Sequence, residues 1–353
     1  VPEAGNDRRG GYPVEDRAMS HEEKAVEVED ITKRYPSITA VNHVSFTVDQ
    51  GEIFGFLGPN GAGKTTLVRM LTTLIPPTSG TARVGCCDIV RQPEEVRLEI
   101  GVVPQALTSD LDLTGYENMD IYGRLYGIPY KERQERIHEL LQRVALLGRE
   151  KDLVATYSGG MRRRLEIARA LVHRPRILFL DEPTIGLDPQ SRLAVWDFLR
   201  GMMKEGGMTT FLTTHYMDEA DELCSRVAII DAGRIIAMGS PAELKSSIPG
   251  NDIISLVVEG RAEDLAGSLK TLPFVHRVTV EGNDIHAAVD SGSKNLAPLV
   301  EQAGGTGVKI TSASIHEQSL EDVFIHYTGK TIREEETKKV SFLAGPGAPP
   351  GQR

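Results

Sequence analysis

The stretch that decides the fold reads EIFGFLGPNGAGKTT, from Glu52 to Thr66. An apolar, strand-like run leads directly into a glycine-rich loop, and a helical stretch begins near Lys64. Glycines at this spacing, followed by Lys and Thr, match a phosphate-binding loop, whose backbone N–H groups and following helix end surround an anion. We expect Lys64 to reach the β- and γ-phosphates and Thr65 to hold Mg²⁺. The residues predicted to surround the nucleotide here are Gly58, Pro59, Asn60, Gly61, Ala62, Gly63, Lys64, Thr65 and Thr66.

Two acids end a second apolar strand. Asp181 and Glu182 close the run RILFLDEP, at the carboxyl edge where ligands bind in open α/β sheets. Adjacent acids at such an edge require a cation, so we expect Asp181 to join the Mg²⁺ shell. Glu182 is suited to polarise the attacking water as a general base. Together with the phosphate loop, this pair predicts hydrolysis of a nucleoside triphosphate.

Two further side chains could take part in the same chemistry. Gln105, in VVPQ, carries an uncharged amide that can touch both the metal and the water. His215, in TTFLTTH, follows an apolar strand and can contact a γ-phosphate. Taken singly, the glutamine carries no signal and a lone histidine is more often structural. Both are therefore catalytic candidates only in combination with Asp181 and Glu182.

A second predicted helix start can also bind an anion. Ser158-Gly159-Gly160 opens the amphipathic segment YSGGMRRRLEIARAL, Tyr157 to Leu171. One interpretation is a serine N-cap followed by glycines that allow close packing. The other is a second phosphate contact. Because one chain would then have two helix ends for one ligand, the second interpretation implies a partner chain.

In this order, the motifs resemble the nucleotide-binding domain of the ABC ATPases over about residues 26–244. The resemblance implies ATP as the nucleotide and a dimer of two such domains. It implies that Tyr35, in ITKRYPSITAV, stacks on adenine, and that Ser158 and Gly160 contact ATP held by the other subunit. Within Gly186-Leu187-Asp188, it places Asp188 across the dimer interface, and it makes His215 a sensor of the γ-phosphate.

A narrower resemblance concerns the signature and the last helical segment. YSGGMRRRLEIA and SLEDVFIHYTG are similar to the daunorubicin-resistance type of exporter ATPase, although Tyr157 and Met161 replace the Leu and Gln of many ABC ATPases. The resemblance implies export of drugs, lipids or glycoconjugates through a separate membrane permease, which would hold two ATPase subunits at the cytoplasmic face of the membrane. Cargo contacts would lie in the permease, so these residues do not select among the cargoes.

Two other function classes stay open. A soluble ABC ATPase of translation would carry two cassettes, and one of DNA maintenance would insert long coiled coils. Here each motif occurs once, and an ordinary helical block separates Thr66 from Tyr157. An ATP-binding regulator without turnover would have no need of Glu182 and His215. The formal net charge of −10 argues against a nucleic-acid partner, and we expect none.

The composition fits a globular chain. Its 353 residues, 40% hydrophobic, suffice for about two domains. Apolar runs such as Ile177 to Leu180 are far shorter than the roughly 20 residues that span a bilayer, so a membrane role requires a partner. Cys86, Cys87 and Cys224 fit neither a disulfide framework nor a zinc-site spacing, which favours a reducing compartment.

We expect an α/β fold in two domains. The first is a P-loop ABC ATPase domain over residues 23–248, with a mixed sheet and a helical subdomain at about 113–174. The second, over residues 252–330, is a small α+β accessory domain in the split βαβ, ferredoxin-like order, with Gly282-Asn283 as a hairpin turn. Residues 1–22 and 331–353 have the composition of flexible tails.

The segment SLEDVFIHYTG predicts a final helix, capped by Ser319 with Asp322 at the capping-box position. One apolar stripe at helical spacing comprises Leu320, Val323, Phe324 and Tyr327. Packing on the sheet of the small domain and docking against the ATPase domain or a second subunit are both open. The family resemblance favours docking.

Overall fold

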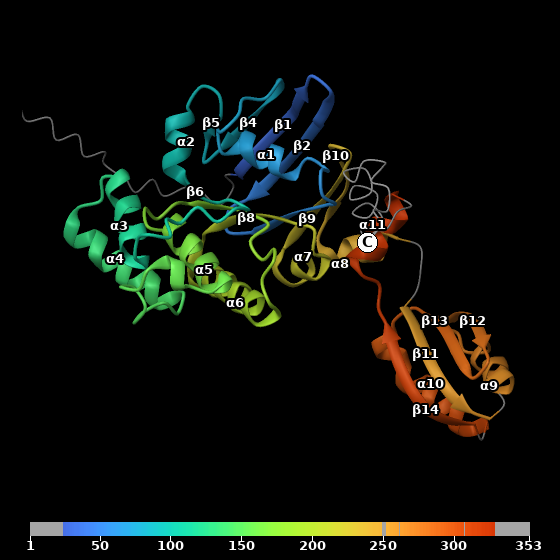
Figure 1. Cartoon of the computed structure of the whole chain (residues 1–353). Helices are drawn as coiled ribbons and strands as arrows, with labels where there is room; N and C mark the ends of the chain where they lie inside the picture. The colour runs from blue at the N-terminus through green and yellow to red at the C-terminus, as the bar shows by residue number, and fades with distance from the viewer. Residues whose placement is uncertain (1–23, 249–251, 261, 307, 329–353) are drawn as a thin grey trace, which may run out of the picture. The chain divides into compact units, whose positions relative to one another are not determined.

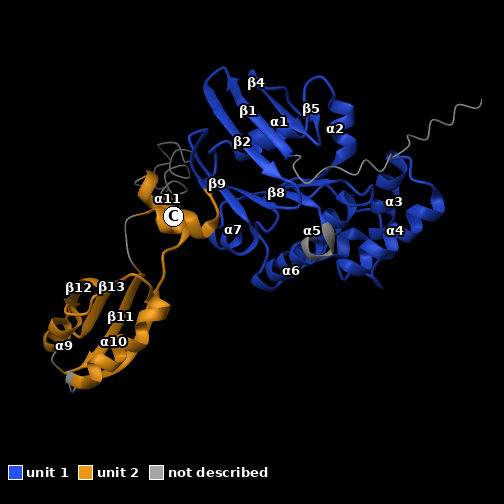
Figure 2. Ribbon diagram, turned by 180° about the vertical axis from the view of Figure 1, so that it is seen from behind, with its two compact units in different colours: residues 1–238 blue, residues 239–353 orange. Residues whose placement is uncertain are grey.

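The computed structural model describes residues 24–248, 252–260, 262–306 and 308–328. It forms two compact units, Val1–Met238 and Gly239–Arg353, which are coloured separately in Figure 2. The tails expected at 1–22 and 331–353 lie outside the described residues. The division between the compact units falls after Met238, which is earlier than the domain border expected near residue 248.

The centre of unit 1 is a six-stranded sheet with the order β10-β9-β3-β8-β7-β6. Strand β3 pairs in parallel with β8 and β9, and β7 pairs in parallel with β6 and β8. The strands span Ile53–Leu57 (β3), Ile100–Val103 (β6), Ile177–Asp181 (β7), Thr209–Thr214 (β8), Arg226–Asp231 (β9) and Arg234–Gly239 (β10). The predicted largely parallel sheet is thus confirmed, and the carboxyl ends of β3, β7 and β8 share one edge.

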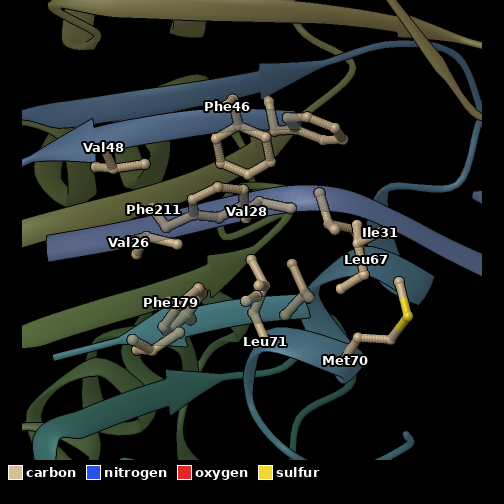
Figure 3. Packing of buried hydrophobic residues seen from close by; sticks show 14 of the residues in the cluster. Val26, Val28, Ile31, Phe46, Val48, Leu67, Met70, Leu71, Phe179 and Phe211 are labelled. Atoms are coloured by element: carbon tan, nitrogen blue, oxygen red, sulfur yellow. The ribbon is translucent and has the colours of Figure 1, made fainter. Parts of the chain in front are cut away.

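A second sheet of unit 1 is antiparallel where its pairing is defined, with the order β2-β1-β4-β5. Its strands span Lys24–Tyr35 (β1), Ile38–Asp49 (β2), Ser79–Val84 (β4) and Cys87–Asp88 (β5). One buried cluster joins both sheets and α1 (Lys64–Leu71), as Figure 3 shows. The Phe211 ring lies 5.4 Å from that of Phe179 and 5.9 Å from that of Phe46, so aromatic packing ties the two sheets together.

Helices cover the sheets and build a separate helical block, visible in Figure 1. The block predicted between residues 113 and 174 contains α3, α4, a short 3₁₀ helix and α5, and its apolar cluster includes Ile137, Leu141 and Leu165. The helices of unit 1 after α1 span Pro93–Glu99 (α2), Gly115–Leu125 (α3), Tyr130–Arg143 (α4), Val154–Thr156 (3₁₀), Gly159–Ala170 (α5), Pro189–Gly206 (α6) and Met217–Leu223 (α7).

Unit 2 contains a four-stranded antiparallel sheet with the order β12-β13-β11-β14. The turn between β12 and β13 contains Gly282 with a left-handed φ of 65°, which suits the predicted hairpin. Its elements span Pro241–Ser247 (α8), Asp252–Glu259 (β11), Ala262–Leu269 (α9), Val275–Glu281 (β12), Asp284–Val289 (β13), Gly292–Thr306 (α10), Lys309–His316 (β14) and Leu320–Thr328 (α11).

The last helix, α11, packs against α8. Its capping box forms as predicted, because the Ser319 hydroxyl accepts from the Asp322 backbone N–H at 3.2 Å while the Asp322 carboxylate accepts from the Ser319 N–H at 2.8 Å. Leu320, Val323 and Phe324 are buried, but they are not part of the cluster that covers the sheet of this unit. Including Tyr327 in the apolar stripe is wrong: it lies in the last turn, 44% exposed, with its ring edge-on to His326.

Candidate active site

The predicted phosphate loop joins the buried strand β3 of unit 1 to α1. Strand β3 is buried along its whole length, and α1 begins at Lys64 directly after Gly63. A Cβ atom at Gly58 would lie 2.3 Å from the Ile230 carbonyl oxygen, and one at Gly63 would lie 2.3 Å from that of Ala40. Gly63 also has a left-handed φ of 112°. Glycine is therefore required at both ends of the loop, where the backbone passes other backbone closely.

The other loop residues differ in exposure. Asn60 and Gly61 are exposed, Thr65 and Thr66 are half-buried, and Ala62 is buried. The Ala62 N–H donates to the Pro59 carbonyl at 3.2 Å. The Lys64 ammonium is 4% exposed; it donates to the carbonyl oxygens of Gly58 at 2.7 Å and Pro59 at 3.1 Å. These bonds hold the lysine charge beneath the loop.

Asp181 collects two hydroxyl groups at the end of β7. Its Oδ1 atom accepts from Thr213 Oγ1 at 2.6 Å and from Thr65 Oγ1 at 3.3 Å. The Asp181 residue is 4% exposed. The first turn of α1 and the ends of β7 and β8 therefore place a hydroxyl group and a carboxylate side by side, a set of hard oxygen donors of the kind that Mg²⁺ prefers.

Glu182 sits between a cation and an imidazole. Its Oε1 atom lies 3.1 Å from the Lys64 ammonium, and its Oε2 atom lies 3.1 Å from His215 Nδ1. The backbone of Glu182 has a left-handed φ of 49°, and its N–H donates to the Thr213 carbonyl at 3.0 Å. A non-glycine residue in this region is strained, and such strain is found most often at functional sites.

The charge of Glu182 follows from these contacts. Burial acts to raise the pKa of the carboxyl, but the hydrogen bond from His215 and the positive charge of Lys64 outweigh burial and bring the pKa below its ordinary value. The carboxylate is thus ionised at neutral pH and accepts only, so Nδ1 of His215 must carry the donated proton. An ionised carboxylate in a water-poor setting is the form that a general base needs.

Gln105 is not joined to this cluster by its side chain. The residue is exposed, and among the described residues its side chain forms no hydrogen bond with Asp181 or Glu182. Its backbone is fixed instead: the buried Arg163 guanidinium donates to the carbonyl oxygens of Pro104 at 2.8 Å and Gln105 at 2.7 Å. The helix α5 thereby positions the segment that carries Gln105.

The segment Ser158-Gly159-Gly160, predicted to begin a helix, lies at the start of α5. Ser158 is its N-cap, with the Met161 N–H donating to Ser158 Oγ at 3.3 Å. Ser158 and Gly159 are exposed, whereas Gly160 is buried. A Cβ atom at Gly160 would lie 2.3 Å from the Ser191 hydroxyl, so this glycine allows α5 to approach the start of α6.

Asp188 occupies the start of α6, next to that approach. It caps the helix by accepting from the Ser191 N–H at 3.0 Å and from the Ser191 hydroxyl at 2.6 Å. These two bonds lower the pKa of the Asp188 carboxyl. Asp188, Ser191 and Gly160 therefore place the Ser158 segment and the Gly186-Leu187-Asp188 loop at one surface of the unit.

Tyr35 and Tyr157 are the two tyrosines that the sequence analysis singled out. Tyr35 ends β1 and is 41% exposed, with the Lys33 ammonium 5.6 Å from its ring centre. Its stacking on adenine stays a prediction. Tyr157, which departs from the family pattern, is buried, and its hydroxyl donates to the Arg149 carbonyl at 2.7 Å. The departure is accommodated in the helical block, where Tyr157 packs over Gly115.

Sequence reasoning missed two residues that shape this site. Thr213 contacts both Asp181 and the backbone of Glu182, and Arg163 holds the backbone around Gln105. The threonine pair in TTFLTTH, directly before His215, is the one signal that could have indicated the first. The second depends on a contact between residues far apart in the chain and has no local signal.

Neither a membrane-spanning helix nor a metal cluster of His, Cys, Asp and Glu occurs in the described part of the chain. No helix there is long and apolar enough to cross a bilayer. Within the described ranges, no group of three or more such side chains could hold a metal ion by itself. A cation at Thr65 and Asp181 would therefore need further oxygen ligands, such as those of a nucleotide phosphate.

Comparison with known families gives two matches. Residues 41–185 match the ABC transporter family, and residues 239–328 match the C-terminal domain of DrrA1-3-like ATP-binding proteins. The second match begins where unit 2 begins.

Comparison with individual proteins agrees. The linearmycin resistance ATP-binding protein LnrL of Bacillus subtilis is 38% identical over 88% of this chain and 100% of its own length. The daunorubicin/doxorubicin resistance ATP-binding protein DrrA of Streptomyces peucetius is 40% identical over 90% of this chain and 96% of its own. Among solved structures, cbiO1 from Clostridium perfringens, part of the ABC transporter complex cbiONQ, covers 64% of this chain and 92% of its own, with 29% identity and a TM-score of 0.59.

Proposed function

This chain belongs to the ATP-binding subunits of ABC transporters, and from that premise we propose that it hydrolyses Mg·ATP to drive a separate permease that exports drugs, lipids or glycoconjugates. Binding and hydrolysis of ATP are properties of the family. The exporter assignment draws on relatives named for resistance to linearmycin and to daunorubicin and doxorubicin. Because cargo contacts lie in the permease, the chain itself does not narrow the cargo further.

One observation carries the catalytic part of the proposal. The Glu182 carboxylate lies within hydrogen-bond distance of both Lys64 and His215. The three residues come from the start of α1, the loop after β7 and the segment after β8. With ATP in the loop, the Lys64 ammonium contacts the β- and γ-phosphates, and its release from Glu182 leaves that carboxylate to accept a proton from the attacking water. His215 then contacts the γ-phosphate while it orients Glu182.

The residues also suit a magnesium ion. Thr65 and Asp181 present a hydroxyl and a carboxylate oxygen 3.3 Å apart, and the amide of Gln105 is proposed as a further ligand. When bound, Mg²⁺ would supply neutralisation of the phosphate charge. The contribution of the chain is to fix Asp181 through Thr213 and to fix the Gln105 backbone through Arg163.

The exposed start of α5 supports a dimer. We assign Ser158, Gly159 and Gly160 to ATP held by a second copy of the chain, with Asp188 at the interface and Tyr35 against the adenine of its own site. Ser158 and Gly159 are open to the surface, as a contact with another subunit requires. The assembled pair would be held by the permease at the cytoplasmic face of the membrane.

The test of this function is capture of the partner. The full chain, tagged and expressed with the genes that neighbour its own, is recovered from the membrane fraction, and its Mg·ATP hydrolysis is measured with and without the captured protein. We expect a multi-span membrane protein to co-purify and to change the rate of hydrolysis. Recovery of ribosomes or DNA in its place would favour a soluble ABC ATPase and contradict the proposal.

A further inference from the structure

Unit 1 contains a completely buried carboxyl group that the proposed mechanism does not use. Glu219, on α7, is 0% exposed. Its Oε1 atom accepts from the Thr184 hydroxyl at 2.8 Å and from the Trp196 indole N–H at 3.0 Å. Its Oε2 atom is buried and has no hydrogen-bond partner. Burying a carboxyl group in this way is unfavourable, so packing alone does not explain the choice of glutamate.

The two donors come from different parts of the site. Thr184 is in the loop from Glu182 to Asp188, and it is itself completely buried. Trp196 is on α6, the helix that Asp188 caps. Glu219 follows His215 by four residues. One oxygen atom thus connects the segment of His215 with the loop that holds Glu182 and with the helix behind Asp188.

Among the described residues, Glu219 forms no ion pair. The positive charge of Arg192 acts on it, but that guanidinium stacks 4.3 Å from the Tyr216 ring centre and lies 3.4 Å from Asp218. Burial raises the pKa of Glu219, although the nearby Thr214 hydroxyl and the hydrogen bonds from Trp196 and Thr184 act in the opposite direction. What holds the carboxyl group in place is therefore a set of neutral donors, of which the Thr184 hydroxyl and the Trp196 N–H lie at 2.8 and 3.0 Å and fix a direction as well as a distance.

We propose that Glu219 is a positioning residue that locks the Glu182–Asp188 loop to the His215 segment, so that the base, the γ-phosphate contact and the dimer-facing aspartate are held in one arrangement. This inference rests on the proposed roles of Glu182, His215 and Asp188. It assigns Glu219 no contact with ATP. Its loss should therefore lower turnover and leave the affinity of a single chain for nucleotide unchanged.

The first experiment compares two substitutions of the full chain. Glu219→Gln keeps one oxygen that can accept from both donors, whereas Glu219→Leu keeps the volume and removes the acceptor. We expect Glu219→Leu to lower kcat by about 10- to 100-fold, as a small displacement of catalytic groups does, with the Kd for ATP within about twofold of the parent. We expect Glu219→Gln to restore most of the rate. Glu222→Gln, on the exposed face of the same helix, is the matched control.

Two donor variants keep the test decisive if Glu219→Leu does not fold. Thr184→Val removes one hydrogen bond at nearly constant shape, and Trp196→Phe removes the other together with part of the indole ring. We expect each to lower kcat without a matching change in Kd. Parent-like kcat in both, or equal losses in Glu219→Gln and Glu219→Leu, would overturn the inference. An inactive parent chain would instead contradict the proposed function, so the two failures are distinguishable.

Discussion

Two helix starts of unit 1, those of α1 and α5, are predicted to bind phosphate, and they differ in how far they are buried. The start of α1 is enclosed: Lys64 is 4% exposed and lies 3.1 Å from Glu182, and Thr65 contacts Asp181. The start of α5 is open: Ser158 and Gly159 are exposed, and the Ser158 hydroxyl accepts the cap bond from the Met161 N–H. The helix dipole is common to both, so it does not by itself make a catalytic site.

The basic residues of the two helix starts underline the difference. The Lys64 ammonium contacts the Gly58 carbonyl of the loop and the Glu182 carboxylate. The three arginines after Met161 each donate to backbone carbonyls of neighbouring segments: Arg162 to Tyr157, Arg163 to Gln105, and Arg164 to Val144. These bonds hold α5 in place, while Ser158 and Gly159 at its start stay exposed. This difference is what the proposed dimer requires, in which the α1 start of one copy and the α5 start of another share an ATP site.

The largest expected effect concerns the base at the enclosed helix start. Glu182→Gln keeps the size and hydrogen bonding of the side chain but removes proton acceptance, so kcat should fall by about 10²- to 10⁴-fold while Mg·ATP still binds. ATP should then hold two copies as a stable dimer, detected by light scattering after size-exclusion chromatography. Parent-like hydrolysis in this variant would contradict the role of Glu182.

A smaller effect is expected from the lysine. Lys64→Ala removes a charge-assisted contact with the phosphates, and nucleotide binding should weaken by about 1.5–3 kcal/mol. Titration calorimetry of the monomeric chain with ATP measures this change. An unchanged Kd would show that the enclosed start of α1 does not hold the nucleotide.

Replacing His215 should shift the pH dependence of hydrolysis. In the parent, the pKa of Glu182 is lowered despite its burial, with the hydrogen bond from His215 as the largest lowering influence. His215→Ala removes that bond, so the pKa should rise and the base should become protonated at higher pH. The acid limb of kcat against pH, normalised for each protein, should therefore move to higher pH. A limb that stays in place or moves to lower pH would contradict this account.

The smallest effect on a single chain is expected at the open helix start. Ser158→Ala removes only the cap of α5, which costs about 1 kcal/mol of stability, and the Kd of the monomer for ATP should not change. Turnover by the dimer should nevertheless fall. If this variant weakened monomer binding as much as Lys64→Ala does, Ser158 would belong to the same site as Lys64.

Local signals account for much of the fold and for the residues proposed in the site. The glycine spacing, the start of α1 at Lys64 and the acids after an apolar strand can all be read within short stretches. Parallel strands bring their carboxyl ends to one edge, which is why Asp181, Glu182 and His215 could be expected beside the loop before any coordinates.

What the sequence did not reveal depends on contacts between distant segments. The separate antiparallel sheet of unit 1 forms by the pairing of β1 with β4. The backbone position of Gln105 is fixed by Arg163, which is on α5. Tyr327 has the right spacing for the stripe on α11 but lies in its last turn, where burial has ended. Periodicity predicts a face of a helix, and only packing decides how far along the helix that face is covered.

The central claim is that each ATP site combines the α1 start of one copy with the α5 start of another, and mixing two inactive variants tests it most directly. Lys64→Ala and Ser158→Arg are purified as full chains and their ATP hydrolysis is measured separately and after mixing. If the sites are shared between copies, random pairing leaves about one quarter of all ATP sites with both halves intact, and hydrolysis reappears in the mixture. If both helix starts serve one site within a chain, the mixture stays as inactive as its components, and the account is wrong.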